Sequence, residues 1–146
     1  MAIMFLGEYQ HSLDSKGRIT IPAKFRDQLS DRFIATKGLE NCIFLFPLSE
    51  WHNIEEKLRS LPMTRADARS FVRFFFSGAS ELEVDKQGRT VIPANLREYA
   101  GIDKDVVIIG VGSRAEIWAS EKWAEYNQEK AGHYEQLAES LVDLGI

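Results

Sequence analysis

Two short basic segments carry the residues whose types and spacing could do chemistry. The first, Asp14–Arg26, reads DSKGRITIPAKFR, and the second, Asp85–Arg97, reads DKQGRTVIPANLR. Arginine can donate paired hydrogen bonds to guanine in the major groove of DNA, and lysine can neutralise phosphate. The segments therefore predict contacts with double-stranded DNA. The basic candidates for these contacts are Lys16, Arg18, Lys24, Arg26, Lys86, Arg89 and Arg97.

The two segments are copies of one another, placed 71 residues apart. They share seven of thirteen positions without a gap, and the register extends outward, where Phe5 and Gly7 recur as Phe76 and Gly78. The backbone of duplex DNA is itself close to two-fold symmetric. Two basic loops related by an internal two-fold axis are therefore what a reader of double-stranded DNA would need.

The duplication also predicts how the 146 residues are organised. Each half holds about 70 residues, which is marginal for an independent core. We therefore expect a single pseudo-symmetric unit over residues 1–146. Half-repeat one covers about 4–61, half-repeat two covers about 75–146, and a helix over about 64–76 joins them.

Each basic segment is expected to sit on a β-hairpin that leads into a short helix. Asp14 and Gly17 fit a type I turn closed by a left-handed residue, and the flanking residues 7–13 and 18–21 have strand character. Pro22 suits the start of a helix. A second hairpin follows over 33–37 and 42–46, and its counterpart in the second half is expected over 106–109 and 116–118. Ser49, Ser120 and a capping box at 64–67 are expected to begin later helices. The helical segment that follows Ser120 is expected to include Leu144.

The aspartates of the two loops have an alternative role that is purely structural. Asp14 can pair with Arg18, and Asp85 with Arg89, to brace the turn, although such an exposed pair contributes well under ~1 kcal/mol. An aspartate can also orient an arginine toward a base. The two roles are compatible, so the motif leaves both open.

Nothing in the sequence predicts an enzyme, a cofactor or a metal site. His11, His52 and His133 lack the spacing of metal ligands, and Cys42 is a single thiol. Asp14 and Asp85 superficially resemble a carboxylate dyad, but the neighbouring cations favour two ionised carboxylates over one shared proton.

The formal net charge of -4 conceals a strong segregation of charge. Residues 14–26 hold one acid and four bases, whereas the chain from Glu116 onward holds seven acids and two bases. Arg65, Arg69 and Arg73 are expected to be solvated or to pair with this acidic segment. With neither a signal-like N-terminus nor a run of about 20 apolar residues, we expect a cytoplasmic protein without membrane contact, its lone Cys42 buried.

The chain closely resembles the MraZ family over nearly its full length. The resemblance rests on the loops DSKGR and DKQGR, each followed by IP and a short helix, on LFPLSEW over Leu45–Trp51, and on FFFSGA over Phe74–Ala79. It implies an α+β fold: a pseudo-two-fold, AbrB-like swapped-hairpin β-barrel made from two tandem half-repeats, with flanking helices.

The resemblance also implies a function. MraZ-type proteins are transcriptional regulators of the bacterial division and cell wall gene cluster, which includes their own operon. Members of the family are expected to form homo-oligomeric rings, to be nucleoid-associated and to read short G-rich direct repeats with their basic hairpin tips. No small-molecule substrate is implied.

Carried over to this sequence, the DNA-binding arginine of the family falls on Arg18 and its counterpart on Arg89, with Asp14 and Asp85 completing the motifs. The loops differ at two positions, because Ser15-Lys16 in the first becomes Lys86-Gln87 in the second. The two tips are therefore expected to contribute unequally.

A protein-interaction module, such as an antitoxin-like partner binder, is the rival reading. AbrB-type folds are not confined to DNA, and a fold alone does not fix function. The acidic C-terminal segment favours this alternative. Binding that survives high salt would support it, because phosphate-dominated binding weakens steeply with salt.

Overall fold

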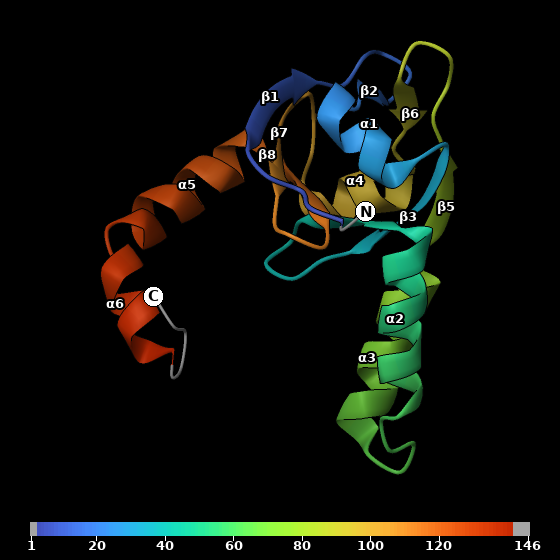
Figure 1. Ribbon diagram of the computed structural model, residues 1–146, viewed down its shortest axis with the longest axis vertical. Helices are drawn as coiled ribbons and strands as arrows, with labels where there is room; N and C mark the ends of the chain where they lie inside the picture. The colour runs from blue at the N-terminus through green and yellow to red at the C-terminus, as the bar shows by residue number, and fades with distance from the viewer. Residues whose placement is uncertain (1–2, 142–146) are drawn as a thin grey trace.

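The computed structural model describes residues 3–141, which fold as a mixed α+β structure (Figure 1). A six-stranded antiparallel sheet has the order β1-β7-β8-β4-β3-β5, and β2 and β6 form a separate two-stranded ribbon. The strands are β1 Glu8–Ser12, β2 Arg18–Thr20, β3 Arg32–Lys37, β4 Ile43–Pro47, β5 Ser80–Glu83, β6 Arg89–Val91, β7 Asp105–Gly110 and β8 Ala115–Ala119. The helices are α1 Ala23–Leu29, α2 Leu48–Arg59, α3 Ala66–Ser77, α4 Ala94–Ala100, α5 Ser120–Ala131 and α6 Tyr134–Ser140.

The two halves of the chain exchange their first strands. β1 pairs with β7 of the second half, and β5 pairs with β3 of the first half. The sheet order reads the same from either edge once each strand is replaced by its counterpart, β1 by β5, β3 by β7 and β4 by β8. The sequence duplication thus becomes an internal pseudo-two-fold axis, which passes through the β2–β6 ribbon.

The predicted first hairpin of each half is wrong in its pairing. The turns form as expected, but β1 pairs with β7 and β2 pairs with β6, so the strands on either side of the turn separate. The closed barrel is not confirmed either. Among the described residues β1 and β5 remain the edges of an open sheet, because β2 and β6 are short and pair with each other instead of bridging the edges.

Other predicted elements are confirmed. The second hairpins form as β3–β4 and β7–β8. α1 and α4 begin directly after Pro22 and Pro93, and they bury Phe25 and Leu96 in the main core. A proline fits there because its fixed φ suits a helix start and its missing N–H is not needed.

The predicted serine caps and the capping box are wrong. α2 begins at Leu48 after Pro47, and α5 begins at Ser120 itself, with no side-chain cap on either helix. α3 begins after Arg65, whose guanidinium pairs with Asp67, and that carboxylate accepts from the Ala68 amide. Leu144, predicted to continue the last helix, lies outside the described residues.

A second apolar cluster covers the other side of the sheet. Cys42 and Trp118 are buried there, and Trp51 and Trp123 pack against the cluster. The tryptophans therefore belong to the core, and burial raises the pKa of the Cys42 thiol. This leaves an inert thiol.

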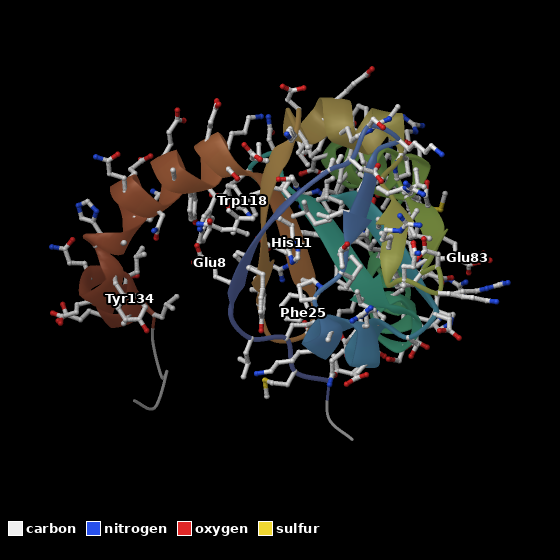
Figure 2. All side chains as sticks on the ribbon, turned by 90° about the horizontal axis from the view of Figure 1, so that it is seen from above. Glu8, His11, Phe25, Glu83, Trp118 and Tyr134 are labelled. Atoms are coloured by element: carbon white, nitrogen blue, oxygen red, sulfur yellow. The ribbon has the colours of Figure 1, made fainter. Side chains whose placement is uncertain are left out.

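Two pairs of helices, α2–α3 and α5–α6, project from opposite ends of the same face of the sheet (Figure 1). On this face α2 contacts β3 and β4, and α5 contacts β7 and β8. The alternative that Arg65 and Arg69 pair with the acidic C-terminal segment is not found among residues 3–141, because Arg65 pairs with Asp67 and Arg69 donates to the Met63 carbonyl. Seen from above, the end of the acidic projection, marked by Tyr134, lies far from the sheet (Figure 2). None of the described helices has the length and apolar character needed to span a membrane.

Candidate nucleic-acid interface

The two loops that follow β1 and β5 have the same backbone geometry. In the first, the Gly17 amide donates to the Asp14 carbonyl at 3.0 Å, and the Asp14 amide donates to the Arg18 carbonyl at 2.9 Å. In the second, the corresponding distances are 3.0 Å and 2.8 Å. Gly17 and Gly88 have φ of 75° and 78°, a left-handed conformation that favours glycine. This explains why glycine recurs at this position.

Each loop aspartate braces its turn with three hydrogen bonds. One Asp14 carboxylate oxygen accepts from the amides of Lys16 and Arg18 at 2.9 Å each, and the other accepts from Arg18 Nε at 2.6 Å. Asp85 repeats the arrangement with Gln87 and Arg89, at 2.9, 2.8 and 3.0 Å. The predicted pairing of each aspartate with its arginine is therefore confirmed.

These contacts lower the pKa of both carboxyls. The largest cause is the backbone hydrogen bond from Arg18 to Asp14, and from Arg89 to Asp85; the arginine side chain adds to it. Both aspartates are consequently ionised at neutral pH. They act as fixed anions that hold the two arginines.

The brace leaves one edge of each arginine available. Nε is bound to the aspartate, which fixes the plane of the guanidinium, while among the described residues no hydrogen bond or ion pair engages the Nη atoms of Arg18 or Arg89. The two side chains are 27% and 30% exposed. Such an edge can donate two parallel hydrogen bonds to guanine O6 and N7.

The β2–β6 ribbon places both arginines on one face. Arg18 lies opposite Val91 and Thr20 lies opposite Arg89. Because side chains alternate along a strand, these four share the outer face, whereas the intervening Ile19 is buried on the inner face. The amides of Ile21 and Ile92 extend the ribbon by donating to the carbonyls of Gly88 and Gly17. The loops therefore lie at the two ends of one rigid ribbon.

Thr20 and Val91 are interface candidates that the sequence reasoning missed. They lie between the two arginines on the outer face, and Val91 is 52% exposed. The signal was available in the alternation, because each residue is two positions after an arginine. The two residues were missed because β2 pairs with β6, a strand from the other half of the chain.

Arg26 and Arg97 support the loops from beneath instead of facing outward freely. A methyl group added at Gly17 would lie 2.6 Å from Arg97 Nη1, and one added at Gly88 would lie 1.7 Å from Arg26 Nη1. Each helix arginine thus packs against the loop of the opposite half. Both side chains are partly buried.

The predicted lysines are all exposed. Lys16 and Lys86 lie on the two loops, one position out of register with each other, and Lys24 lies in the first turn of α1. These lysines add positive charge around the ribbon, which lies away from both helical projections (Figure 1). Within residues 3–141, no group of three or more histidine, cysteine or acidic side chains is placed to hold a metal ion.

Comparisons with known proteins agree in pointing to one family. The family model described as "MraZ protein, putative antitoxin-like" matches twice, over residues 4–74 and 75–144. Proteins named transcriptional regulator MraZ are similar to nearly the whole chain. That of Syntrophomonas wolfei is 71% identical over 143 residues, covering 98% of this chain and 100% of the relative. Those of Desulforamulus reducens and Heliobacterium modesticaldum are 62% and 58% identical, covering 97% and 98% of this chain and 99% and 100% of the relatives.

Proposed function

The chain belongs to the MraZ family, and we propose on this premise that it is a sequence-specific DNA-binding transcriptional regulator. One observation carries the proposal: the outer face of the β2–β6 ribbon presents Arg18 and Arg89 related by the internal two-fold, each held by an ionised aspartate. The names of the relatives support the same function.

The dimensions of the ribbon suit the major groove of DNA. A two-stranded ribbon fits a groove about 12 Å wide. Arg18 and Arg89 occupy diagonal positions of the ribbon, which are typically about 7–8 Å apart, or roughly two base-pair steps of about 3.4 Å. Both arginines can therefore reach guanines in one groove.

The nine side chains proposed for the interface divide by role. Arg18 and Arg89 read bases, Asp14 and Asp85 orient them, Lys16, Lys86 and Lys24 contact phosphate, and Arg26 and Arg97 hold the loops and add positive charge. We propose that the two half-repeats, about 4–61 and 75–146 joined by a helix about 64–76, act as one unit because β1 and β5 are exchanged between them.

The finer biological setting follows from the family resemblance. The operator is a set of G-rich direct repeats upstream of the protein's own operon, within the division and cell wall gene cluster. The protein acts in the cytoplasm on the nucleoid, as a homo-oligomer that closes into a ring. A ring would repeat the basic ribbon at fixed intervals, as direct repeats require.

A titration of DNA binding tests this function. Fluorescence anisotropy with DNA from upstream of the gene, at two salt concentrations and with competitor DNA, is expected to give tight, salt-sensitive binding. Arg18→Ala is expected to weaken it by about 1–3 kcal/mol. Arg59→Ala is the matched control, since Arg59 pairs with Glu55 on α2, away from the ribbon (Figure 1). Equal affinities of wild type and Arg18→Ala would contradict the proposal.

A second candidate function is an antitoxin-like partner binder. The description of the matching family model favours it, as does the acidic α5–α6 projection. Recovery of one stoichiometric protein partner in high salt, together with no specific DNA binding by folded wild type, would establish this function instead.

A further inference from the structure

The outer face of the β2–β6 ribbon holds a second pair of side chains beside the two arginines. Val91 lies opposite Arg18, and Thr20 lies opposite Arg89. Opposed side chains on one face of an antiparallel pair of strands have Cβ atoms about 4.5–5.5 Å apart. Each arginine therefore has one of these two residues as its direct neighbour across the ribbon.

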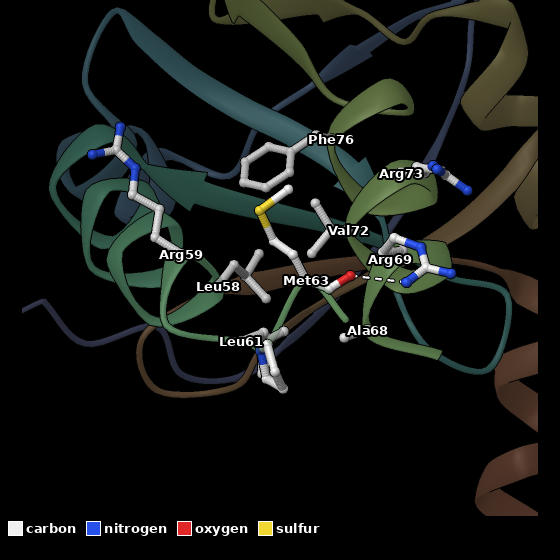
Figure 3. Close-up of a pocket in the computed structure, with 10 residues that line it drawn as sticks. Leu58, Arg59, Leu61, Met63, Ala68, Arg69, Val72, Arg73 and Phe76 are labelled. Carbon is white, nitrogen blue, oxygen red and sulfur yellow. Dashed lines mark hydrogen bonds between the residues drawn. The ribbon is translucent and has the colours of Figure 1, made fainter. Parts of the chain in front are cut away.

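Val91 has no apolar partner on this face of the described structure. It is 52% exposed and packs against neither apolar cluster of the fold, and its neighbours on the outer face are the two arginines and Thr20. Other exposed apolar side chains have apolar neighbours. Met63 of the α2–α3 projection, for example, lies beside Phe76 in a groove with a mainly apolar lining (Figure 3). The position of Val91 within a basic face therefore points to an apolar group on the molecule that binds there.

Thr20 occupies the position of Val91 in the other half of the ribbon, and it is also exposed. Both side chains are β-branched, which suits a strand. Their chemistry differs, because valine ends in two methyl groups, whereas threonine has one methyl group and a hydroxyl that can donate and accept hydrogen bonds. Strand propensity accounts for the branched shape of both residues and not for this difference in polarity.

The major groove of DNA offers an apolar group that suits Val91, the C5-methyl group of thymine. The groups that distinguish the other bases there are hydrogen-bond donors and acceptors. Val91 can contact only the methyl group, whereas Thr20 can contact a methyl group, a donor or an acceptor. The diagonal of about 7–8 Å between the arginines corresponds to roughly two base-pair steps of about 3.4 Å, so the shorter distance between Arg18 and Val91 corresponds to about one step.

The difference between Val91 and Thr20 also breaks the two-fold symmetry of the ribbon. The internal two-fold exchanges Arg18 with Arg89, so rotation about it leaves an arginine at both positions. A ribbon with identical residues at the other two positions would bind a DNA site equally well in two opposite directions. Of the four outer-face residues, Thr20 and Val91 are the pair that differs between the halves. This pair can therefore select one direction.

We propose that Val91 recognises the methyl group of a thymine next to the guanine contacted by Arg18, and that its contrast with Thr20 sets the direction of the ribbon on the DNA. This inference rests on the proposed function, to which it adds a thymine and a direction. The two arginines supply equivalent contacts from both halves, and Val91 supplies a contact that only one half has.

Removal of single methyl groups from the DNA tests the thymine contact. In duplexes from upstream of the gene, each thymine in turn is replaced by uracil, which lacks only the C5-methyl group. One replacement is expected to weaken binding of the wild type about fourfold in anisotropy, the effect of burying one methyl group. Val91→Ala is expected to weaken binding of the unmodified duplex by a similar factor and to bind its thymine and uracil forms equally. Val111→Ala is the matched control, since Val111 is also exposed but lies in the turn between β7 and β8, outside the ribbon.

Two results of these titrations would overturn the thymine contact. One is a wild type that binds every uracil duplex as tightly as the unmodified duplex while Arg18→Ala still weakens binding, a result that leaves the proposed function intact. The other is a methyl effect that persists unchanged in Val91→Ala. The absence of specific binding by folded wild type would instead overturn the proposed function and this inference together. Circular dichroism checks the folding of each variant.

A DNA-cleaving reagent attached to one loop tests the direction. Cys42 is buried, so Ser15→Cys supplies a single accessible thiol, to which an iron–EDTA reagent is attached. On a duplex with one binding site, cleavage is expected on one side of the recognised guanine and thymine. Exchange of the two residues, by Thr20→Val with Val91→Thr, is expected to move the cleavage to the other side. Cleavage on the same side after the exchange, or equal cleavage on both sides before it, would overturn the proposed direction.

Discussion

The two loops of the ribbon share a backbone but differ in the side chains they expose. Each uses an aspartate, a left-handed glycine and an arginine to build the same set of hydrogen bonds. The residues between them differ, because Ser15-Lys16 in the first loop stands where Lys86-Gln87 stands in the second. The comparison separates the residues that fix the geometry from those that are free to differ in their contact with a partner.

The arginines should give the largest effect if both loops work alike. Arg18→Ala and Arg89→Ala are each expected to weaken specific DNA binding by about 1–3 kcal/mol, and the double variant by approximately the sum, because the proposed function places both guanidiniums in one groove. Anisotropy titrations of the three variants measure this. A full effect from one arginine and none from the other would break the equivalence of the loops.

Substitution of the two loop glycines should lower the free energy of unfolding by different amounts. Gly17→Ala and Gly88→Ala both force a left-handed alanine, which costs about 1–2 kcal/mol. Gly88→Ala should cost more, because its methyl group would lie 1.7 Å from Arg26 Nη1 and displace that side chain. Urea unfolding measures the difference, and placing Gly88→Ala in an Arg26→Ala background should remove the excess. An excess that persists there would show that Arg26 is not its cause.

The lysines should sharpen the difference between the loops through salt dependence. Lys16→Gln is expected to reduce the slope of log affinity against log salt by roughly one unit, and Gln87→Lys to increase it by a similar amount, because the proposed function assigns one phosphate contact to each lysine. The base preference should stay the same in both variants. A lost base preference with an unchanged slope would instead make Lys16 a reader of bases.

The aspartates should have the smallest effect on stability, and we expect it to appear as a change in the pH dependence of stability. Their folded-state pKa values are lowered, so their contribution to stability is full above the unfolded-state pKa and is lost as pH falls through the folded value below 3.8. Asp14→Asn combined with Asp85→Asn should therefore flatten the pH dependence of thermal unfolding below about pH 4. If the pH dependence of thermal unfolding in acid stays unchanged, other carboxylates determine it.

The sequence predicted much of the local structure. The glycines and aspartates predicted the loops, the prolines predicted the starts of α1 and α4, and Cys42 was correctly placed in the core. The loops and the helix starts depend on interactions within a few residues, whereas Cys42 was placed in the core by the apolar run CIFLF around it. A short motif contains all the residues that make such local interactions, so its sequence is enough to predict them.

What the sequence did not predict depends on contacts between the two halves. The pairing of β1 with β7, and of β2 with β6, is set by burial across the pseudo-two-fold axis and not by the turn that separates the strands. The same pairing explains why Thr20 and Val91 were missed. The serine caps were wrong because the N-cap positions of α2 and α5 are Pro47 and Ala119. Neither of these side chains can accept a hydrogen bond from the helix amides.

Mapping the DNA contacts by photo-cross-linking tests the central claim most directly. Ser15→Cys and Gln87→Cys place a single accessible thiol on each loop without removing a basic residue, and Glu56→Cys on α2 is the control. With a thiol-linked photo-cross-linker, both loop variants are expected to form cross-links to guanine-rich operator DNA, and the control none. Cross-links from α2 alone, with none from either loop, would contradict the claim that the ribbon is the DNA-reading surface.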